Sequence, residues 1–449
     1  MSFADEVKGK KVLVFGLGLQ GGGVGDALWL IKHGATVRVT DLKSEDELED
    51  SLAKLPDNIS HSLGQHLDED IEWADIIIKN PGVPDSQPQI TLARELGKPV
   101  FTSIALVVKE ARDKTIGITG TRGKSTTTEL TYSLLNSLFP GEIIKGGNIP
   151  GTSGLQLLDQ LADVKYLVLE LSSFQLANFH DHQLSPRYSI LTNIYPDHLN
   201  RYEDMEAYQH DKSAIYAYQN STDFLIYNQT NQIAASMASS APGKLIPFES
   251  STLPDLTLQL PGEHNKENVA AVYELAKILD LDLASFKEVA EEFSSVPFRL
   301  ELIRELDGVR YYNDTTSTTP TATIKALSSF SSPTVLILGG DQKHLPTDDL
   351  ITALKDSLNL TDIILLGSHN IPEFTSKLTN SCGDLIRSQV NSMVEAVSDA
   401  TSAVQEGGIV LLSPGFASFD LFENEFDRGR QFNQAVKSLN LISTSSLDH

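Results

Sequence analysis

Residues 116–128 read IGITGTRGKSTTT. A short β-branched run leads into glycines, a lysine and hydroxyl residues, which is the order of a phosphate-binding loop between a strand and a helix. Glycine lets backbone N–H groups approach anionic oxygens, and the following helix adds the positive end of its dipole. Lys124 can reach terminal phosphates, while the hydroxyl of Ser125 or Thr126 can bind Mg²⁺. The stretch therefore predicts a nucleotide-binding α/β domain.

The spacing of this loop departs from the common form. That form needs a glycine at position 118, where the chain has Ile118, so only the compact pattern from Gly120 to Ser125 is present. The alternative is an ordinary glycine-rich turn without a ligand. Strand, glycines, lysine, hydroxyls and helix formers follow in the right order, which favours nucleotide binding.

Composition limits the class of protein. The chain has 449 residues, which predicts several domains, and its 40% hydrophobic and 21% charged residues are typical of a soluble enzyme. A net charge of −25 argues against nucleic acid as a partner. The single cysteine, Cys382, excludes an internal disulfide and a cysteine-based metal site. The N-terminus lacks a signal-peptide pattern and no apolar run approaches the ~20 residues of a membrane span, so we expect a cytoplasmic protein with no membrane partner.

The N-terminal part carries a dinucleotide-binding pattern. A buried-type strand at residues 10–15 leads into GLGLQG at 16–21, and a second strand at 35–40 ends at Asp41. In a NAD enzyme Asp41 would hold the ribose hydroxyls. The glycine run at 21–23 is unusual, and a turn without any ligand is the alternative.

Further glycine-rich loops follow strands. NPGVP at residues 80–84 follows the strand at 74–79, where the ligands of α/β sheets bind. GGNIPG occupies residues 146–151. Glu170 comes directly after a buried strand at 166–169, where a Mg²⁺ ligand is expected beside a phosphate loop. A salt-bridged or capping carboxylate is the alternative for Glu170.

Two more candidates follow the strand at residues 189–193. Asp197 and His198 are adjacent, which suggests contacts with a metal or a phosphate, although a lone histidine is more often structural. Lys212 lies in a helical segment, and the pattern alone favours a solvated surface lysine.

The next stretch carries little chemistry. Residues 228–258 are rich in Ser, Ala and Gln, and we expect loops and short hairpins there. An amphipathic helix follows at 269–279. Asn265 and Asn268 precede or open it and could either bind a base edge through their amides or cap the helix.

The last third alternates strands and helices, which predicts a parallel sheet with functional residues at the carboxyl ends of its strands. Asp314 ends one strand and precedes a hydroxyl run at residues 315–319. Lys343 and Ser418 follow two other strands. Lys343 and the hydroxyls could hold an amino-acid substrate, although loop solubility is the better interpretation for most of the threonines.

Taken together, these motifs resemble the Mur ligases of peptidoglycan synthesis over essentially the whole chain. The resemblance is carried, in family order, by GLGLQG, NPGVP, TGTRGKST, GGNIPG, ELSSFQL, PDHLNRY, GEHNKEN, FRLE, YYNDTTSTTP, LGGDQKH and LLSPGFASFD. It implies three α/β domains: a Rossmann-like domain for a UDP-sugar (1–107), a central P-loop ATPase domain with a mixed or parallel sheet (108–297) and a Rossmann-like amino-acid domain (298–449).

The resemblance also implies the reaction. ATP phosphorylates a substrate carboxylate, the amine of an amino acid attacks the acyl phosphate, and phosphate leaves. Three of the motifs favour the branch that adds D-glutamate to UDP-N-acetylmuramoyl-L-alanine. These substrates and ATP would be the partners of a cytoplasmic monomer, with Mg²⁺ at two sites and Mn²⁺ as a substitute.

Roles for individual residues follow from the same resemblance. Lys124, Glu170, His198 and Lys212 are expected to be catalytic, and Ser125, Glu170, His198 and a carbamylated Lys212 to bind metal, which reverses the interpretation of Lys212 from pattern alone. The expected ATP contacts are Gly120, Thr121, Arg122, Gly123, Lys124, Ser125, Thr126, Asn265, Asn268, Arg299 and Asp314. The expected UDP-substrate contacts are Gly18, Leu19, Gln20, Asp41, Asn80, Gly82, Asn148 and Ser172. The expected amino-acid contacts are Thr318, Lys343, Ser418 and Phe426.

The chain departs from the family pattern at Arg122, Thr316, Gly415 and Phe416, and Phe426 is shifted. A related ligase that adds another amino acid, such as L-glutamate, is therefore the first alternative. A NAD-dependent oxidoreductase would explain GLGLQG and Asp41 but not the second phosphate loop. A nucleotide-dependent binding module without turnover is disfavoured by the intact set of catalytic residues.

Overall fold

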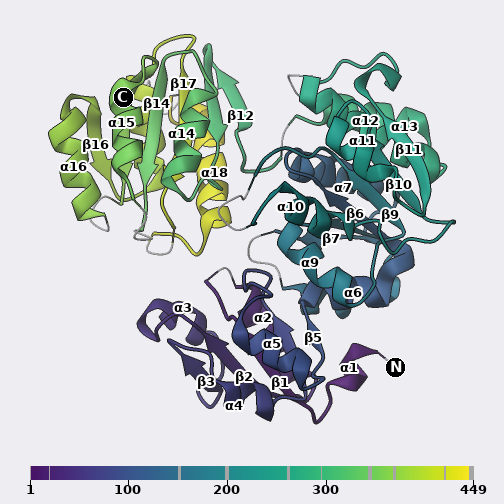
Figure 1. The fold of residues 1–449 in the computed structure, drawn as a ribbon. Helices are drawn as coiled ribbons and strands as arrows, with labels where there is room; N and C mark the ends of the chain where they lie inside the picture. The colour runs from purple at the N-terminus through teal and green to yellow at the C-terminus, as the bar shows by residue number, and fades with distance from the viewer. Residues whose placement is uncertain are drawn as a thin grey trace. The chain divides into compact units, whose positions relative to one another are not determined.

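The computed structural model describes residues 2–19, 21–149, 153–197, 202–259, 263–294, 296–341, 346–367, 371–418 and 421–443. The chain divides into two compact units, Met1–Phe293 and Ser294–His449. The first unit contains two β-sheets and the second contains one, each with its own helices (Figure 1). The predicted fold class, α/β with three domains, is confirmed.

The N-terminal sheet has five strands in the order β3-β2-β1-β4-β5, and all of its pairs are parallel. This is the order of a doubly wound nucleotide-binding fold, in which ligands bind where the strand order reverses, here between β1 and β4. The strands are β1 (Lys11–Phe15), β2 (Thr36–Asp41), β3 (Ser60–Leu63), β4 (Ile76–Lys79) and β5 (Val100–Phe101). The helices are α1 (Phe3–Glu6), α2 (Gly22–Lys32), α3 (Glu49–Leu52), α4 (Asp68–Trp73), α5 (Pro88–Glu95) and α6 (Ser103–Ala111).

Strand β1 shows why its residues form a central strand. Val12 and Val14 pack into one hydrophobic cluster, whereas Leu13 and Phe15 pack into another. Because successive side chains of a strand point to opposite faces, a continuous apolar run buries both faces of a parallel sheet. The strand at 335–338 behaves in the same way in the second unit.

The central sheet has six strands in the order β11-β10-β9-β6-β8-β7, and all of its pairs are parallel. Strand β6 therefore lies between β8 and β9, so the loops after these three strands are neighbours. The strands are β6 (Thr115–Thr119), β7 (Ile143–Gly147), β8 (Tyr166–Glu170), β9 (Tyr188–Leu191), β10 (Phe224–Asn228) and β11 (Lys244–Phe248). The helices are α7 (Lys124–Leu138), α8 (Gly154–Leu158), α9 (Ser173–Asp181), α10 (Met205–Ser213), α11 (Gln232–Ala238), α12 (Glu263–Ile278) and α13 (Leu283–Glu292).

The expectation of loops and short hairpins at residues 228–258 is wrong. This stretch forms helix α11 and strand β11, which pairs in parallel with β10. Asn231 caps α11 by accepting a hydrogen bond from the backbone N–H of Ala234, and three apolar side chains of the helix are buried. Strand β11 lies at the edge of the sheet, where Pro247 is tolerated because the edge needs fewer donors.

The sheet of the second unit has the order β12-β13-β17-β14-β15-β16. Only β12 runs antiparallel, joined to β13 by Asp307 and Gly308 at φ 50° and 75°, the signature of a tight hairpin turn. The strands are β12 (Glu301–Leu306), β13 (Val309–Asn313), β14 (Thr334–Gly339), β15 (Leu360–Leu366), β16 (Ile386–Val390) and β17 (Ile409–Gly415). The helices are α14 (Pro320–Ser328), α15 (Asp348–Asp356), α16 (Pro372–Cys382), α17 (Met393–Ala403) and α18 (Glu425–Ser443).

None of the described helices combines the length and the apolar character that crossing a membrane requires.

Candidate active site

The predicted phosphate loop connects β6 to α7. Gly120 has φ 149° and Gly123 has φ 83°, and Gly123 is the residue that precedes the first turn of α7. A Cβ atom at Gly120 would lie 2.0 Å from the Thr192 hydroxyl oxygen, and one at Gly123 would lie 2.3 Å from Oδ1 of Asn268. Both positions therefore need glycine, for their backbone conformation and for the close approach of neighbouring side chains.

Residues after β9 hold this loop through its backbone. The N–H of Thr121 donates to the carbonyl of Asn193 at 2.8 Å, and the N–H of Arg122 donates to the Asn193 side-chain oxygen at 2.9 Å. The hydroxyl of Thr192 donates to the carbonyl of Arg122 at 2.7 Å. The loop is thus fixed by its backbone, while the Arg122 side chain is exposed.

Two lysines converge on one carbonyl of the loop. Nζ of Lys124 donates to the carbonyl oxygens of Gly120 and Thr121, at 3.0 Å each. Nζ of Lys212, from α10, donates to the same Gly120 carbonyl at 2.9 Å. Lys212 is 1% exposed, so the interpretation of this residue as a surface lysine is wrong. Burial, and after it the charge of Lys124, lowers the pKa of Lys212 well below its usual value.

Glu170 ends β8 beside the phosphate loop and is 6% exposed. Asn148 contacts it twice: its N–H donates to the Glu170 carbonyl at 2.7 Å, and its side-chain amide donates to Oε1 at 3.0 Å. A Cβ at Gly147 would lie 2.0 Å from the Glu170 carbonyl oxygen, and its φ is 98°. The glycines of GGNIPG therefore bring Asn148 onto Glu170.

These residues fit a divalent metal in part. A buried carboxylate such as Glu170 and a hydroxyl such as that of Ser125, in the first turn of α7, are oxygen ligands of the kind that Mg²⁺ prefers. The unmodified amine of Lys212 donates its hydrogen bonds to oxygen atoms, so it offers no ligand to a cation in this form. His198 lies outside the described residues.

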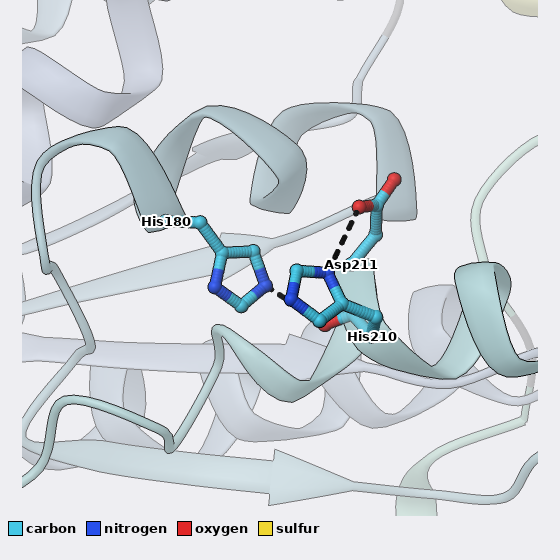
Figure 2. Close-up of side chains that lie close together, drawn as sticks. All are labelled: His180, His210 and Asp211. Carbon is cyan, nitrogen blue, oxygen red and sulfur yellow. Dashed lines mark hydrogen bonds and ion pairs between the residues drawn. The ribbon is translucent and has the colours of Figure 1, made fainter.

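A second cluster of possible metal ligands, His180, His210 and Asp211, joins α9 to α10 (Figure 2). Nε2 of His180 lies 2.8 Å from the carbonyl oxygen of His210, and Nδ1 lies 2.8 Å from the Tyr218 hydroxyl. Both ring nitrogens of His180 are therefore engaged, and the two imidazoles stack with centroids 4.1 Å apart. This arrangement does not fit one shared metal. It ties α9 to the helix that carries Lys212.

The glycine loop of the N-terminal domain contacts the predicted acid and amide. Gly16 and Gly18 have φ 90° and 68°. One oxygen of Asp41 accepts from the N–H of Gly18 at 2.9 Å and the other from the N–H of Lys43 at 3.0 Å. A Cβ at Gly16 would lie 2.9 Å from Cβ of Asn80. Asp41 is buried and supports the loop, so the structure does not place its carboxylate as a free ribose ligand.

The remaining UDP-substrate candidates divide between two places. Leu19 is 50% exposed on the glycine loop, and Gly82 donates its N–H to the Asn80 side chain at 2.8 Å. Ser172 instead caps α9, two residues after Glu170. Together with Asn148 it belongs to the central sheet, and Gln20 lies outside the described residues.

The two asparagines of GEHNKEN lie inside α12 rather than at its cap, so the capping alternative is wrong. Asn268 is buried with Oδ1 against Gly123, and its amide donates to Oδ1 of Asn265 at 3.3 Å. Helix α12 thus reaches the phosphate loop through Asn268.

In the second unit, Arg428 joins three loops at the carboxyl end of the sheet. It is 0% exposed, and burial lowers its pKa to about 10. Nε and Nη2 donate to the hydroxyl and carbonyl of Thr315 at 3.0 and 3.1 Å. Nη1 donates to the carbonyls of Phe416 and Ala417 at 3.2 and 3.0 Å and lies against Gly340. The sequence analysis missed this residue because an arginine within a helix gives no signal of burial.

Asp314 anchors the hydroxyl loop from inside the protein. Its carboxylate accepts hydrogen bonds from the hydroxyls of Ser317 and Ser413 and from the backbone N–H of Leu300. Burial raises the pKa of Asp314. Thr315 and Ser317 are buried, so loop solubility is the wrong interpretation for these two hydroxyl residues.

The other amino-acid candidates are partly defined. Ser418 is 2% exposed and Thr318 is half-buried, both on loops that end strands of this sheet. Phe426 packs edge-on against Phe298 with ring centroids 5.8 Å apart. Phe416 belongs to the hydrophobic core. Arg299 is exposed, and Lys343 lies outside the described residues.

Comparison with known families gives two matches. Residues 10–102 match the model of the Mur ligase MurD-like N-terminal domain, and residues 118–252 match that of the Mur ligase middle domain.

Relatives match over nearly the full length. A UDP-N-acetylmuramoylalanine–D-glutamate ligase from Roseiflexus sp. is 36% identical over 96% of this chain and 99% of its own. An enzyme of the same name from Clostridium kluyveri is 33% identical over 97% and 98% of the two chains.

Solved structures share the fold. UDP-N-acetylmuramate-alanine ligase MurC from Thermotoga maritima aligns with a TM-score of 0.53 at 20% identity, over 96% of this chain and 99% of that one. MurF from Acinetobacter baumannii aligns with a TM-score of 0.53 at 18% identity, over 98% and 92%.

Proposed function

The chain belongs to the Mur ligase family, and we propose that it joins D-glutamate to UDP-N-acetylmuramoyl-L-alanine with hydrolysis of ATP to ADP and phosphate. The observation that carries the proposal is the convergence of Lys124, Lys212 and Glu170 around one phosphate loop in a chain 36% identical to a ligase of that name. A carboxylate is a poor acyl donor until one of its oxygens becomes a leaving group, and phosphorylation by ATP achieves this.

We propose that the phosphate loop binds ATP. The N–H groups of Thr121 and Arg122 donate to Asn193, so those of Gly123 to Ser125, where α7 begins, are the proposed phosphate donors. Lys124 would exchange its bonds to loop carbonyls for bonds to the terminal phosphate. The exposed Arg122 adds a second cation at the mouth of the loop. Asn265 and Asn268 come from a helix that touches the loop at Gly123, which supports their role near the nucleotide.

Glu170 and Ser125 are the proposed Mg²⁺ ligands, with Mn²⁺ as a substitute. When bound, the metal neutralises charge on the phosphate oxygens. Asn148 holds the Glu170 carboxylate by a 3.0 Å hydrogen bond and so fixes its orientation. His198 is the proposed ligand of a second metal ion.

Lys212 is the proposed carbamate. Its lowered pKa leaves a larger fraction of neutral amine, whose lone pair can form a bond to the carbon of CO₂ and release a proton. The product is an anion that can pair with Lys124 and bind metal. A carbamylated Lys212 can therefore bind metal, as the family resemblance implies, whereas a buried, unmodified amine cannot.

The amino acid is proposed to bind in the second unit. The carbonyl-rich loops that Arg428 joins carry Thr318 and Ser418, and Lys343 would pair with a substrate carboxylate. Arg299 and Asp314 are the proposed ATP contacts of this unit. The amine of D-glutamate attacks the acyl carbon, a tetrahedral intermediate forms, and the C–O bond to phosphate breaks.

The UDP-sugar is proposed to bind at the glycine loop between β1 and β4, where Gly18, Asp41 and Asn80 meet. The proposed domains are residues 1–107 for this substrate, 108–297 for ATP and 298–449 for the amino acid. Small molecules are the proposed partners of a cytoplasmic monomer.

Lys124→Ala tests the proposal. Turnover should be lost while binding of the UDP-substrate, measured by calorimetry, stays within about twofold of wild type, because the change removes phosphoryl stabilisation only. Lys287→Ala, on helix α13, is the matched control and should keep full turnover. Full turnover by Lys124→Ala would contradict the proposal.

A further inference from the structure

Asp26, on α2, is a buried carboxylate that the proposed reaction does not use. It is 7% exposed, and no ion pair to it is found among the described residues. Its Oδ1 accepts hydrogen bonds from the Ser153 hydroxyl at 2.6 Å and from the backbone N–H of Leu155 at 3.1 Å. Burial raises its pKa to about 6, against the hydrogen bonds from Ser153, Leu155 and Ser103. Burying the Asp26 carboxylate is energetically unfavourable, and hydrogen-bond donors from α8 and α6 hold it in place.

The backbones meet closely at this point. A Cβ at Gly25 would lie 2.5 Å from Cβ of Ser153, and a Cβ at Gly154 would lie 2.5 Å from the Ser103 hydroxyl oxygen. Glycine at these two positions lets α2, α8 and α6 approach within reach of the Asp26 carboxylate. The contact accordingly has little room to shift without breaking its hydrogen bonds.

The other end of α2 holds the end of α8. The indole N–H of Trp29 donates to one oxygen of Asp159 at 2.8 Å, and Nζ of Lys32 donates to the other at 2.6 Å. Nε2 of His33 lies 3.2 Å from the first oxygen. Helix α2 therefore fixes both ends of α8.

Each of the two helices follows a loop of the candidate active site. Helix α2 begins directly after Gly21, the last glycine of GLGLQG. Helix α8 follows GGNIPG, in which Asn148 is hydrogen-bonded to Glu170. The α2–α8 contact therefore links the segments that follow the two loops, and in the sequence only residues 149–153 separate Asn148 from α8.

We propose that Asp26 is a positioning residue: by anchoring α8 to α2 it sets the Asn148–Glu170 pair in register with the glycine loop of the N-terminal domain. The proposal rests on the proposed function, in which the first loop binds the UDP-substrate and Glu170 binds the metal at ATP. Asp26 touches neither substrate. It aligns the substrate carboxylate with the phosphoryl group through the two helices.

Steady-state kinetics of Asp26→Ala and Ser153→Ala, with Asp26→Asn as the conservative variant, test the proposal. We expect kcat to fall about 10- to 100-fold in Asp26→Ala, since misplacement by about 1 Å has effects of this size, and less in Ser153→Ala. Dissociation constants of the UDP-substrate and of a non-hydrolysable ATP analogue should stay within about threefold, because each loop remains intact. Asp26→Asn keeps an acceptor oxygen and should recover most of kcat.

Asp282→Ala is the control for loss of a carboxylate away from the α2–α8 contact, because Asp282 is an exposed cap of α13 that accepts from the N–H of Ser285 at 2.9 Å. It should lower thermal stability and leave kcat unchanged. An Asp26→Ala enzyme that loses stability like Asp282→Ala but keeps kcat would overturn the proposal, as would parallel loss of substrate binding. If Asp26→Ala does not fold, Ser153→Ala decides by the same criteria. Wild-type enzyme without D-glutamate-dependent turnover would instead overturn the proposed function.

Discussion

Replacing Arg428 with methionine should weaken binding of the amino acid, while opposing terms limit its effect on the stability of the second unit. The cation has no partner of opposite charge within hydrogen-bonding distance among the described residues, and its role is to join three loops. Arg430→Met, two residues along α18 on an exposed side chain, is the matched control.

The expected stability change is small because two terms oppose each other. Burial lowers the pKa of Arg428 from 12.5 to about 10, which corresponds to a cost of roughly 3 kcal/mol that methionine avoids. Against this, the carbonyls of Thr315 and Phe416 lose their donor, at about 1–3 kcal/mol each. The carbonyl of Ala417 still accepts a hydrogen bond from the N–H of Asp341 at 3.0 Å, so it adds no comparable loss. The net effect should lie between a gain of about 1 kcal/mol and a loss of about 3 kcal/mol in stability.

The kinetic effect should be confined to the amino acid. Loss of one positive charge and of loop order should weaken D-glutamate binding by about 1–2 kcal/mol, or about 5- to 30-fold in KM. The KM values for ATP and for the UDP-substrate should not change. The assay is phosphate release at varied D-glutamate, together with the melting temperature. An Arg428→Met enzyme with wild-type KM for D-glutamate would refute the reasoning, and so would an equal rise in KM for Arg430→Met.

Three further outcomes follow from the first unit. Gly147→Ala forces a Cβ to 2.0 Å from the Glu170 carbonyl and should lower kcat at least about 10-fold, measured at saturating Mg²⁺, whereas Gly141→Ala meets nothing within 4 Å and should not. In ¹³C-bicarbonate, the wild-type NMR spectrum should show a carbamate carbon that Lys212→Ala lacks, and short carboxylates should partly restore turnover of that variant. Because burial raises the pKa of Asp26 to about 6, the native state keeps this proton to higher pH than the unfolded chain does. Stability should therefore fall from about pH 4 to about pH 6 and then level off, and denaturation of Asp26→Asn should lack this decline.

The sequence predicted what depends on local pattern. Apolar runs such as residues 12–15 indicated buried strands, and the glycines of the phosphate loop indicated close approach of the backbone. Gly123 and Gly147 lie where those patterns placed them. These features depend on a few consecutive residues, so no knowledge of distant partners is needed.

What the sequence did not indicate depends on partners far along the chain. The structural role of Asp26 depends on its hydrogen bond with Ser153, which is 127 positions away. That of Arg428 depends on its hydrogen bond with Thr315, which is 113 positions away. Burial of Lys212 likewise depends on the packing of α10 against the loop after β6. The parallel strand at Lys244–Phe248 was missed because a short run that contains proline and lies within a Ser-rich stretch resembles a loop, although proline is tolerated in a strand at the edge of a sheet.

The central claim is tested most directly by ATP-dependent phosphate release from purified protein with UDP-N-acetylmuramoyl-L-alanine and a panel of D- and L-amino acids. The account predicts turnover with D-glutamate and none above background with L-glutamate or the other amino acids. Equal or faster turnover with L-glutamate would contradict it.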